Sequence, residues 1–419
     1  MLNFRPIKIP IMCTPKFLSL LAFVALLACS NSGTKESKDS DAGKSDSSNN
    51  NTSSGGSVEA DDGSVAALTD YYQSLPLNKI ELPKGFVIDV YAEVENARSL
   101  AISPSGIIYV GNRDGDKVYA IKDTDGDFRA DKKWVIGSGL KSPNGVAFKD
   151  GDLYVAEISR IIKFPGIESR LAAPGKAVIV NDTYPTAQDH GWKYIAFGPD
   201  GRLYVPVGAP CNICEPKEEI FASITRINAD GTGREIFASG IRNTVGFTWH
   251  PDTKELWFTD NGRDMMGNDI PNCELNVAPK QGMHFGYPYC HEGSVKDPEF
   301  GKKRDCKEFT PPVEKLGPHV APLGLKFYTG NMFPSDYRNS IFIAKHGSWN
   351  REKKIGYDVS VVKIENGKSV GHQTFASGWL DDASQKVWGR PVDVLVLKDG
   401  SLLVSDDHAN VIYRISYKP

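Results

Sequence analysis

Asp189 and His190 stand directly before the stretch GWKYIAFGPDGRLYV, which has the pattern of two short strands joined by a Gly-containing turn. A histidine in this position has two interpretations. It is either a residue of a surface turn or a general base delivered to a pocket, because imidazole can take up a proton near neutral pH. The place of the following strand in the fold decides between them.

The sequence excludes several function classes. No G-x-G-x-x-G follows a strand pattern and there is no P-loop, so nicotinamide, Rossmann-type flavin and ATP chemistry have no support. The 419 residues carry 49 Lys and Arg against 52 Asp and Glu, for a formal charge of -3, without a basic block. Binding to nucleic acid needs such a block, so nucleic acid is not an expected partner.

The N-terminus has the pattern of a lipoprotein signal peptide, which we predict for residues 1–29. Arg5, Lys8 and Lys16 precede the apolar run FLSLLAFVALLA, which is too short to span a bilayer as a stable helix. The run ends in LLAC and resembles a bacterial lipobox, in which the cysteine, here Cys29, is lipidated. The alternative is an ordinary cleaved signal peptide with an incidental cysteine.

The expected location follows from the residues after Cys29. Ser30 is not acidic, which favours an exported lipoprotein anchored to the outer membrane, on its periplasmic side or at the surface. Residues 30–65 are rich in Ser, Asn, Asp and Gly and contain no aromatic residue, so they cannot bury enough apolar surface to order themselves. We predict a flexible linker there and a folded domain over residues 66–419.

That domain repeats one pattern: an apolar approach, a Gly-containing turn and an alternating strand. Six copies follow one another: SLAISPSGIIYVGNR, PNGVAFKDGDLYVAE, KYIAFGPDGRLYVPVG, VGFTWHPDTKELWFTD, GLKFYTGNMFPSDYRNSIFIAK and VDVLVLKDGSLLVSDD. Six strand pairs of this kind predict an all-β fold, a six-bladed β-propeller. The run GFVIDVYAEV has no partner of its own, and we expect it to close the last blade. A two-sheet sandwich would not need this length.

The propeller gives the opening histidine a place. Residues just before each inner strand lie around one end of the central channel, and in this chain they are polar or charged: Arg98, Asn144, Asp189 with His190, Arg242 with Asn243, His319 and Arg390. Ordinary packing needs small or apolar residues there. So cationic a ring predicts a site for an anionic ligand, although single members could instead bond exposed loop backbone.

Six motifs then occur in a fixed order: DHGWKYIAFGPDGRLYV, GIRNTVGFTWHP, TDNGRD followed by ELN, HVAPLGLKFYTGNMFP, AKHGSWNR and GRPVDV. With them, residues 80–419 resemble the pyrroloquinoline quinone (PQQ) dependent sugar dehydrogenases, in particular the sorbosone and aldose dehydrogenase branch. In that family the histidine of the Asp-His pair removes the proton of the anomeric hydroxyl while the C1 hydride passes to PQQ.

The resemblance implies a role for each matching residue. His190 would be the general base, and Asp189 would orient it or tune its basicity. Arg242 matches the arginine that stabilises negative charge on the quinone oxygen, and Asn243 matches its neighbour. Further cofactor contacts are expected from Arg98, Asn144, His319, His346, Arg351 and Arg390. The glucose-specific enzymes have a second arginine where this chain has Val392, so this cationic contact is either missing or supplied by Arg98 or Arg351.

The same resemblance implies a calcium ion beside PQQ, held by the main-chain carbonyls of Gly262 and Arg263 with Asp260 and Glu274 as supports. A second calcium signal is independent of it. The segment DTDGDFRAD brings several carboxylates to a short Gly-bearing turn: Asp123, Asp125, Asp127 and Asp131. We expect a structural calcium there, with a solvated acidic hairpin as the alternative.

Five cysteines belong to the folded domain. Cys211-Asn-Ile-Cys214 is followed by glutamate rather than histidine, so it is not a haem attachment site, and no ligand set for zinc accompanies it. Disulfides Cys211–Cys214 and Cys290–Cys306 suit an exported protein. Comparison with the family leaves Cys273 unpaired.

The sequence thus predicts a PQQ- and calcium-dependent enzyme that oxidises an aldose or aldehyde sugar and passes electrons to a quinone or a cytochrome. Only the lipid anchor would contact the membrane. One alternative is a calcium-dependent hydrolase of the gluconolactonase type, which would need carboxylates and asparagines around an axial metal. The other is a non-catalytic propeller that binds a sugar or a partner.

Overall fold

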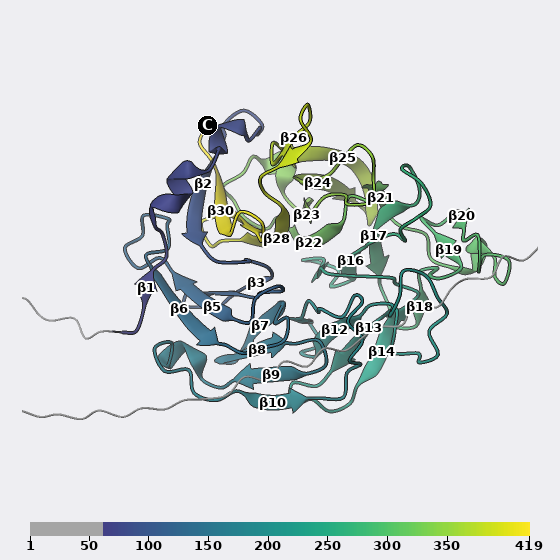
Figure 1. Ribbon diagram of the computed structural model, residues 1–419, viewed down its shortest axis with the longest axis horizontal. Helices are drawn as coiled ribbons and strands as arrows, with labels where there is room; N and C mark the ends of the chain where they lie inside the picture. Colours follow the sequence, from purple (N-terminus) through teal and green to yellow (C-terminus); the bar gives the residue numbers. More distant parts are fainter. Residues whose placement is uncertain (1–61) are drawn as a thin grey trace, which may run out of the picture. The chain divides into compact units, whose positions relative to one another are not determined.

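The computed structural model describes residues 62–419, which form six sheets arranged in a ring (Figure 1). The predicted six-bladed β-propeller is confirmed. The predicted signal peptide, the lipidation of Cys29 and most of the predicted linker lie outside the described residues. Within residues 62–419, no helix is long and apolar enough to cross a membrane.

Each blade is built on one sequence repeat, and the first strand of the repeat lies at the centre of the ring. The first, third and sixth blades each add an outer strand from elsewhere in the chain. From the centre outward, the first blade contains β3 Leu100–Ile102, β4 Ile108–Val110, β5 Val118–Lys122, β6 Lys132–Gly137 and β1 Val65–Ala66. The second blade contains β7 Gly145–Lys149, β8 Asp152–Ala156, β9 Ile161–Phe164 and β10 Val178–Asn181. The third blade contains β11 Ala196–Phe197, β12 Leu203–Val207, β13 Ser223–Ile227, β14 Glu235–Ser239 and β18 Met283–His284.

The last three blades follow the same order. The fourth blade contains β15 Phe247–Trp249, β16 Leu256–Asp260, β17 Asn272–Ala278 and β21 Glu314–Pro318. The fifth blade contains β22 Pro322–Phe327, β23 Ile341–Lys345, β24 Asp358–Glu365 and β25 Lys368–Ala376. The sixth blade contains β28 Pro391–Val396, β29 Leu402–Asp406, β30 Val411–Tyr417 and β2 Phe86–Glu93. The inner strands contact one another around the axis, β3 with β7 and β28, and β22 with β15 and β28.

Short elements decorate the blades. Two small hairpins pair β19 Cys290–His291 with β20 Val295–Lys296, and β26 Leu380–Asp381 with β27 Lys386–Val387. The helical segments are single turns of 3-10 helix: η1 Asp70–Ser74, η2 Leu77–Lys79, η3 Ile167–Ser169, η4 Cys306–Glu308 and η5 Ser335–Tyr337.

The turns explain why the repeat forms hairpins. Between β7 and β8 the loop is Asp150-Gly151, because Lys149 pairs with Asp152. The φ angles of Asp150 and Gly151 are 50° and 88°, both in the left-handed region. A two-residue turn with both residues at positive φ matches the right-handed twist of the flanking strands, and Asp-Gly is a favoured sequence for it.

The expected closure of the ring is confirmed. β2, from the N-terminal part of the chain, pairs antiparallel with β30 from Phe86 opposite Tyr417 to Glu93 opposite Val411. The sixth blade therefore combines the C-terminal strands with a strand from the N-terminal part of the chain, which gives the edge of β30 a partner and closes the propeller.

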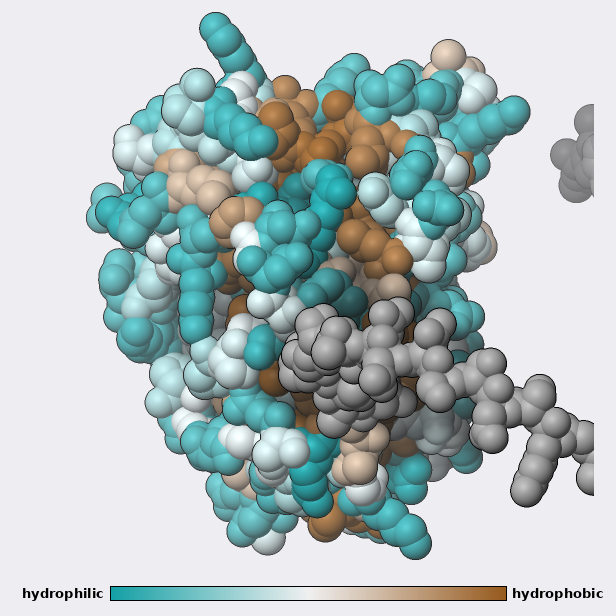
Figure 2. Space-filling view, turned by 90° about the vertical axis from the view of Figure 1, so that its left-hand side faces the viewer, coloured by the Kyte–Doolittle hydropathy of each residue, from teal (hydrophilic) through white to brown (hydrophobic). Residues whose placement is uncertain are grey.

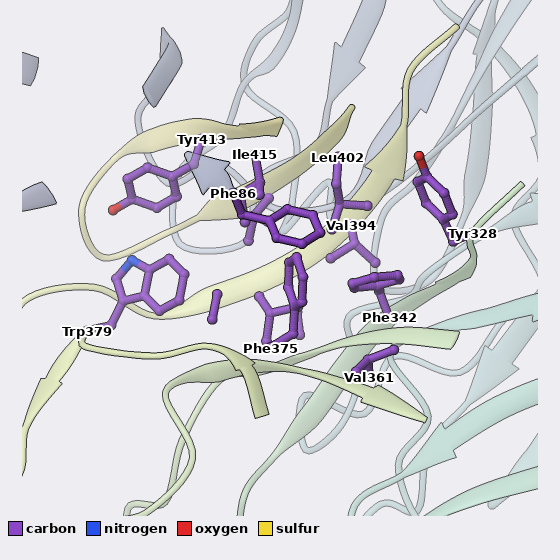
Figure 3. Packing of buried hydrophobic residues seen from close by; sticks show 14 of the residues in the cluster. Phe86, Tyr328, Phe342, Val361, Phe375, Trp379, Val394, Leu402, Tyr413 and Ile415 are labelled. Atoms are coloured by element: carbon purple, nitrogen blue, oxygen red, sulfur yellow. The ribbon is translucent and has the colours of Figure 1, made fainter. Parts of the chain in front are cut away.

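Apolar side chains fill the spaces between neighbouring blades. Figure 3 shows the cluster between the fifth and sixth blades, where Phe86 of β2 meets Phe375 of β25. The ring centroids of Phe86 and Phe375 lie 4.9 Å apart in an edge-to-face arrangement, and Phe333 lies 4.8 Å from Phe86. On the face shown in Figure 2 most exposed residues are hydrophilic.

Both predicted disulfides are present. Cys211 is bonded to Cys214 and Cys290 to Cys306, and Cys273 is a buried free thiol in β17. The first pair closes a loop beside the channel, while the second ties the β19–β20 hairpin to η4.

We expect that Phe86→Ala destabilises the protein by about 3–5 kcal/mol, because it removes a large buried side chain from the closing strand. Val87 points the other way on β2 and is 40% exposed. Val87→Ala should therefore change the free energy of unfolding by less than about 1 kcal/mol. Urea unfolding followed by tryptophan fluorescence measures both. Equal losses would show that β2 contributes only edge pairing.

Candidate active site

In each blade the inner strand and the second strand are antiparallel. The start of the inner strand and the end of the second strand therefore lie at the same end of the ring. A cavity of about 250 Å³ lies there. Its lining includes many residues that the sequence predicted for the site: Arg98, His190, Arg242, Asn243, Gly262, His319, His346 and Arg390. Arg113 adds a fourth guanidinium group, so the cavity wall suits an anionic ligand.

His190 enters the cavity from a strained turn before β11. Its φ of 49° lies in the left-handed region, which non-glycine residues seldom adopt. Gly208, just after β12, makes room for this turn, since a Cβ there would lie 2.5 Å from the Cβ of His190. Nδ1 of His190 lies 2.8 Å from the carbonyl oxygen of Ala209. A carbonyl only accepts, so Nδ1 carries the proton and Nε2 is left to accept one.

The environment keeps this histidine neutral. Burial, reinforced by the positive charge of Arg242, lowers the pKa of His190 to about 4. At neutral pH the ring is therefore unprotonated and able to act as a base. It is a weak base, because both causes disfavour the imidazolium form.

Asp189 does not orient His190, which was one of the two roles predicted for it. The side chain of Asp189 is exposed, and the bond that fixes the ring comes from Ala209. Asp189 acts on His190 only through its charge, which raises the pKa of the imidazole against the larger effect of burial.

Arg242 and Asn243 are held through their backbone by the carboxylate of Asp260, at the end of β16. The Arg242 and Asn243 amide groups donate to its two oxygens at 3.0 and 2.7 Å. Burial raises the pKa of Asp260 to about 6. The guanidinium group of Arg242 forms an ion pair with Asp264 at 3.0 Å and is almost completely buried.

A second network orients Arg98 and His346. Asp407, just after β29, accepts from Nη1 of Arg98 and from Nε2 of His346, both at 2.8 Å. Burial raises the pKa of Asp407, but His346 and Arg98 outweigh it and hold that pKa well below its usual range. Asn144 does not line the cavity as expected. It is fully buried and accepts from Nε of Arg98 at 2.9 Å, so it fixes that arginine from behind.

The two remaining arginines that were predicted to contact the cofactor differ in position, and only one of them lines the cavity. Arg390 lines the cavity, and its Nε donates to the carbonyl of His346 at 3.0 Å. Arg351 lies outside the cavity lining, where it donates to the carbonyl of Asn268 at 2.8 Å and pairs with Asp269 at 2.7 Å. Its charge is used to hold a loop, so it cannot replace the arginine missing at Val392.

The predicted metal region lies at the end of β16. Gly262 lines the cavity, whereas the side chain of Arg263 turns away and pairs with buried Asp297 at 2.5 Å. Glu274 lies opposite Asp260 in the β16–β17 register. Its carboxylate accepts from the side-chain amide of Asn276 and from the backbone amide of Glu292. Burial raises the pKa of Glu274 to about 8. Asp260 and Glu274 are thus behind the cavity wall, and the prediction for the Gly262 and Arg263 carbonyls stays a prediction.

The acidic loop lies on the first blade, away from the cavity. Carboxylate oxygens of Asp123, Asp125 and Asp127 come within 4.8 Å of one another. The Asp131 carboxylate instead accepts from the backbone amide and from the hydroxyl group of Thr124. The structural calcium at this loop stays a prediction with three carboxylates rather than four.

Sequence reasoning missed Arg113 and other polar or aromatic residues of the cavity lining, among them Trp192, Asn261, Asp264 and Trp349. Arg113 lies 4.0 Å over the ring of Trp192, and Trp349 is 66% exposed at the rim. Most of these residues follow the second strand of a blade. Those strands end where the inner strands begin, so the same geometric argument applied to strand ends would have found them.

Comparison with known proteins places this geometry in a family. Residues 168–413 match the glucose/sorbosone dehydrogenase family. An uncharacterized protein of Borreliella burgdorferi is 32% identical over 358 residues, which cover 81% of this chain and 91% of that protein.

Two solved structures have the same fold. The holo form of the PQQ domain of pyranose dehydrogenase from Coprinopsis cinerea gives a TM-score of 0.68 at 17% identity and covers 80% of this chain and 97% of that one. The calcium structure of a Trichoderma reesei carbohydrate-active enzyme of family AA12 gives 0.68 at 18% identity, with 81% and 97% covered. The chain belongs to the glucose/sorbosone dehydrogenase family, and its structure is similar to those of PQQ sugar dehydrogenases.

Proposed function

We propose that this protein is a PQQ-dependent oxidoreductase that oxidises an aldose or aldehyde sugar. The observation that carries the proposal is the pairing of a neutral, oriented imidazole, His190, with four guanidinium groups in one cavity. The imidazole suits proton removal and the guanidinium groups suit an anionic cofactor. Family membership supports the same chemistry.

The residues of the cavity fit PQQ, which is a planar tricarboxylate. Arg98, Arg113 and Arg390 offer charge-assisted hydrogen bonds to carboxylates, and the lining also has two tryptophans, Trp192 and Trp349. The indole N–H of Trp192 is buried without a protein acceptor, so a bound ligand could satisfy it. These residues would hold the cofactor, and Arg113 supplies the cation that Val392 does not.

When bound, PQQ supplies a quinone that accepts two electrons as hydride from the sugar carbon. The chain supplies the other half of the reaction. Nε2 of His190 takes the proton of the sugar hydroxyl, so hydride and proton leave the same C–OH group, which becomes C=O. Arg242, fixed by Asp264 and by the backbone contact to Asp260, stabilises negative charge on the cofactor side.

Calcium beside PQQ, with ligands from the Gly262 and Arg263 carbonyls, is part of the same proposal, as are the structural calcium at Asp123, Asp125 and Asp127 and the transfer of electrons to a quinone or a cytochrome. Export as a lipoprotein anchored through Cys29 is also proposed. The Coprinopsis cinerea and Trichoderma reesei structures support both cofactors by analogy.

The lactonase alternative has less support. Asn243, Asn261 and Asp264 do line the cavity, as that chemistry would need. However, the Asp264 carboxylate is paired with Arg242, and the Asn261 amide donates to the Asn243 carbonyl at 2.9 Å. These groups already hold the cavity wall, and the cationic lining opposes a metal that binds there without an anionic cofactor.

We expect His190→Ala to retain PQQ, because the cationic contacts come from other residues, and to slow sugar-driven reduction of PQQ by about 10²- to 10⁴-fold. Stopped-flow absorbance of the reconstituted protein measures the reduction. His408→Ala is the control, since His408 is exposed and outside the cavity lining. A wild-type rate in His190→Ala would contradict the proposal.

The pH dependence of kcat/KM follows from the low pKa of His190. Because burial and Arg242 hold that pKa at about 4, the base is unprotonated throughout pH 6–8. The rate should show no His190 titration in that range and should fall as the pH drops toward 4, when the imidazole is protonated. A loss of activity centred near pH 6.5 would mean that the group has an ordinary pKa.

Calcium removal should release the cofactor without unfolding the propeller, since the core packs independently of the cavity. After exhaustive chelation we expect loss of PQQ absorbance on gel filtration, an unchanged far-UV spectrum, and recovery when calcium and PQQ are added back. Stoichiometric PQQ that survives chelation would rule out the ion at Gly262 and Arg263.

A further inference from the structure

The loop closed by the Cys211–Cys214 disulfide reaches the guanidinium group of Arg242. Nε of Arg242 donates to the backbone carbonyl of Asn212, inside this loop, at 2.9 Å. Nη2 of Arg242 donates to the side-chain Oδ1 of Asn212, also at 2.9 Å. Asn212 therefore accepts two hydrogen bonds from the guanidinium group, which also forms the ion pair with Asp264.

The Asn212 amide also holds the segment after β16, which lines the same cavity. Its Oδ1 accepts from the backbone amide of Asp264 at 2.9 Å, and its Nδ2 donates to the carbonyl of Asp264 at 3.1 Å. Asp264 directly follows Gly262 and Arg263. One side chain thus joins the guanidinium group to the segment after β16, so neither can move without breaking a bond to Asn212.

The loop itself has no strand or helix to hold it. Residues 208–222, between β12 and β13, contain no regular element. The disulfide closes the loop, and Tyr287 supports it, since its hydroxyl accepts from the amide of Cys214 at 3.1 Å. Ile213 packs in a small apolar cluster with Tyr287. The position of Asn212 therefore depends on the disulfide and on Tyr287 rather than on sheet pairing.

We propose that Asn212 is a positioning residue of this site, and that the Cys211–Cys214 disulfide acts through Asn212 to fix Arg242 toward the cavity. A preorganised guanidinium group binds an anion without the cost of ordering its side chain. The expected effect on PQQ affinity rests on the proposed function, whereas the orientation of Arg242 does not.

Two variants test the proposal. Asn212→Ala removes the amide, and the double variant Cys211→Ser/Cys214→Ser opens the loop. The controls are Ile213→Ala, in the same loop but without a contact to Arg242, and Cys290→Ser/Cys306→Ser, which removes the other disulfide. If Asn212→Ala does not fold, Asn212→Gln displaces the same amide by one methylene and is expected to give the same changes.

The first measurement is a PQQ titration in calcium, followed by quenching of tryptophan fluorescence, since Trp192 and Trp349 line the cavity. Without the hydrogen bonds from Arg242 to Asn212, the guanidinium group is no longer fixed toward the cavity, and its charge-assisted contact with PQQ is weakened. The Kd for PQQ should therefore rise about tenfold or more in the two test variants. The controls should stay within about threefold of the wild-type Kd, the spread expected for changes away from the site.

The second measurement needs no cofactor. In the apo protein, NMR titration of the His190 ring, assigned with His190→Asn, reports the nearby charge of Arg242, which helps to hold the pKa of His190 low. Displacing the guanidinium group should raise that pKa toward its ordinary value in the test variants and leave it unchanged in the controls. Asp189, whose charge acts in the other direction, is intact in all of them.

The two measurements separate the failures. A wild-type protein that binds no PQQ would refute the proposed function and leave the His190 titration to decide the role of Asn212. A folded Asn212→Ala with the wild-type His190 pKa and, where PQQ binds, the wild-type Kd would overturn the positioning role. Equal effects in Ile213→Ala would also overturn it, because they would mean that any change in the loop moves Arg242.

Discussion

Pairing of Arg98, Arg242 and Arg390 with fixed acceptors is the interaction on which this site depends. Several guanidinium groups brought to one channel end repel one another, and burial removes the water that would otherwise screen them. Asp407 pairs with Arg98, and Asp264 pairs with Arg242. Arg390 instead donates to main-chain carbonyls. The cations are thereby held in place while the cavity keeps a positive field for an anion.

The scaffold makes such pairing possible because it is closed. Pairing of β2 with β30 locks the ring, and the apolar layers between blades fix the inner strands. Strain is then tolerated at the cavity. His190, His319 and Ala321 all have positive φ angles, of 49°, 60° and 50°. Such backbone conformations cost free energy, and they persist where the surrounding structure determines them and a side chain must point in one direction.

The sequence predicted what depends on local pattern. Repeated strand pairs and turns gave the propeller, and the position before each inner strand placed Arg98, His190 and Arg242 at one cavity. It could not predict partners supplied by distant segments. Asn144 was expected at the ligand but bonds Arg98, a residue 46 positions away, and the carboxylate that orients His346 comes from the last blade. Such pairings depend on side-chain rotamers and on which blade lies opposite, and neither leaves a periodic signal.

The low pKa of His190 constrains how the proposed oxidation proceeds. A base with a pKa of about 4 takes the proton of an unactivated sugar hydroxyl in a separate step only at a large cost in free energy, because that hydroxyl is a far weaker acid. The hydroxyl becomes acidic only as hydride leaves the same carbon and the C=O bond forms. In the proposed reaction proton and hydride would therefore depart together, and Arg242 would serve both transfers. Its charge adds to burial in keeping His190 unprotonated and, on the cofactor side, would attract the electrons that leave the sugar.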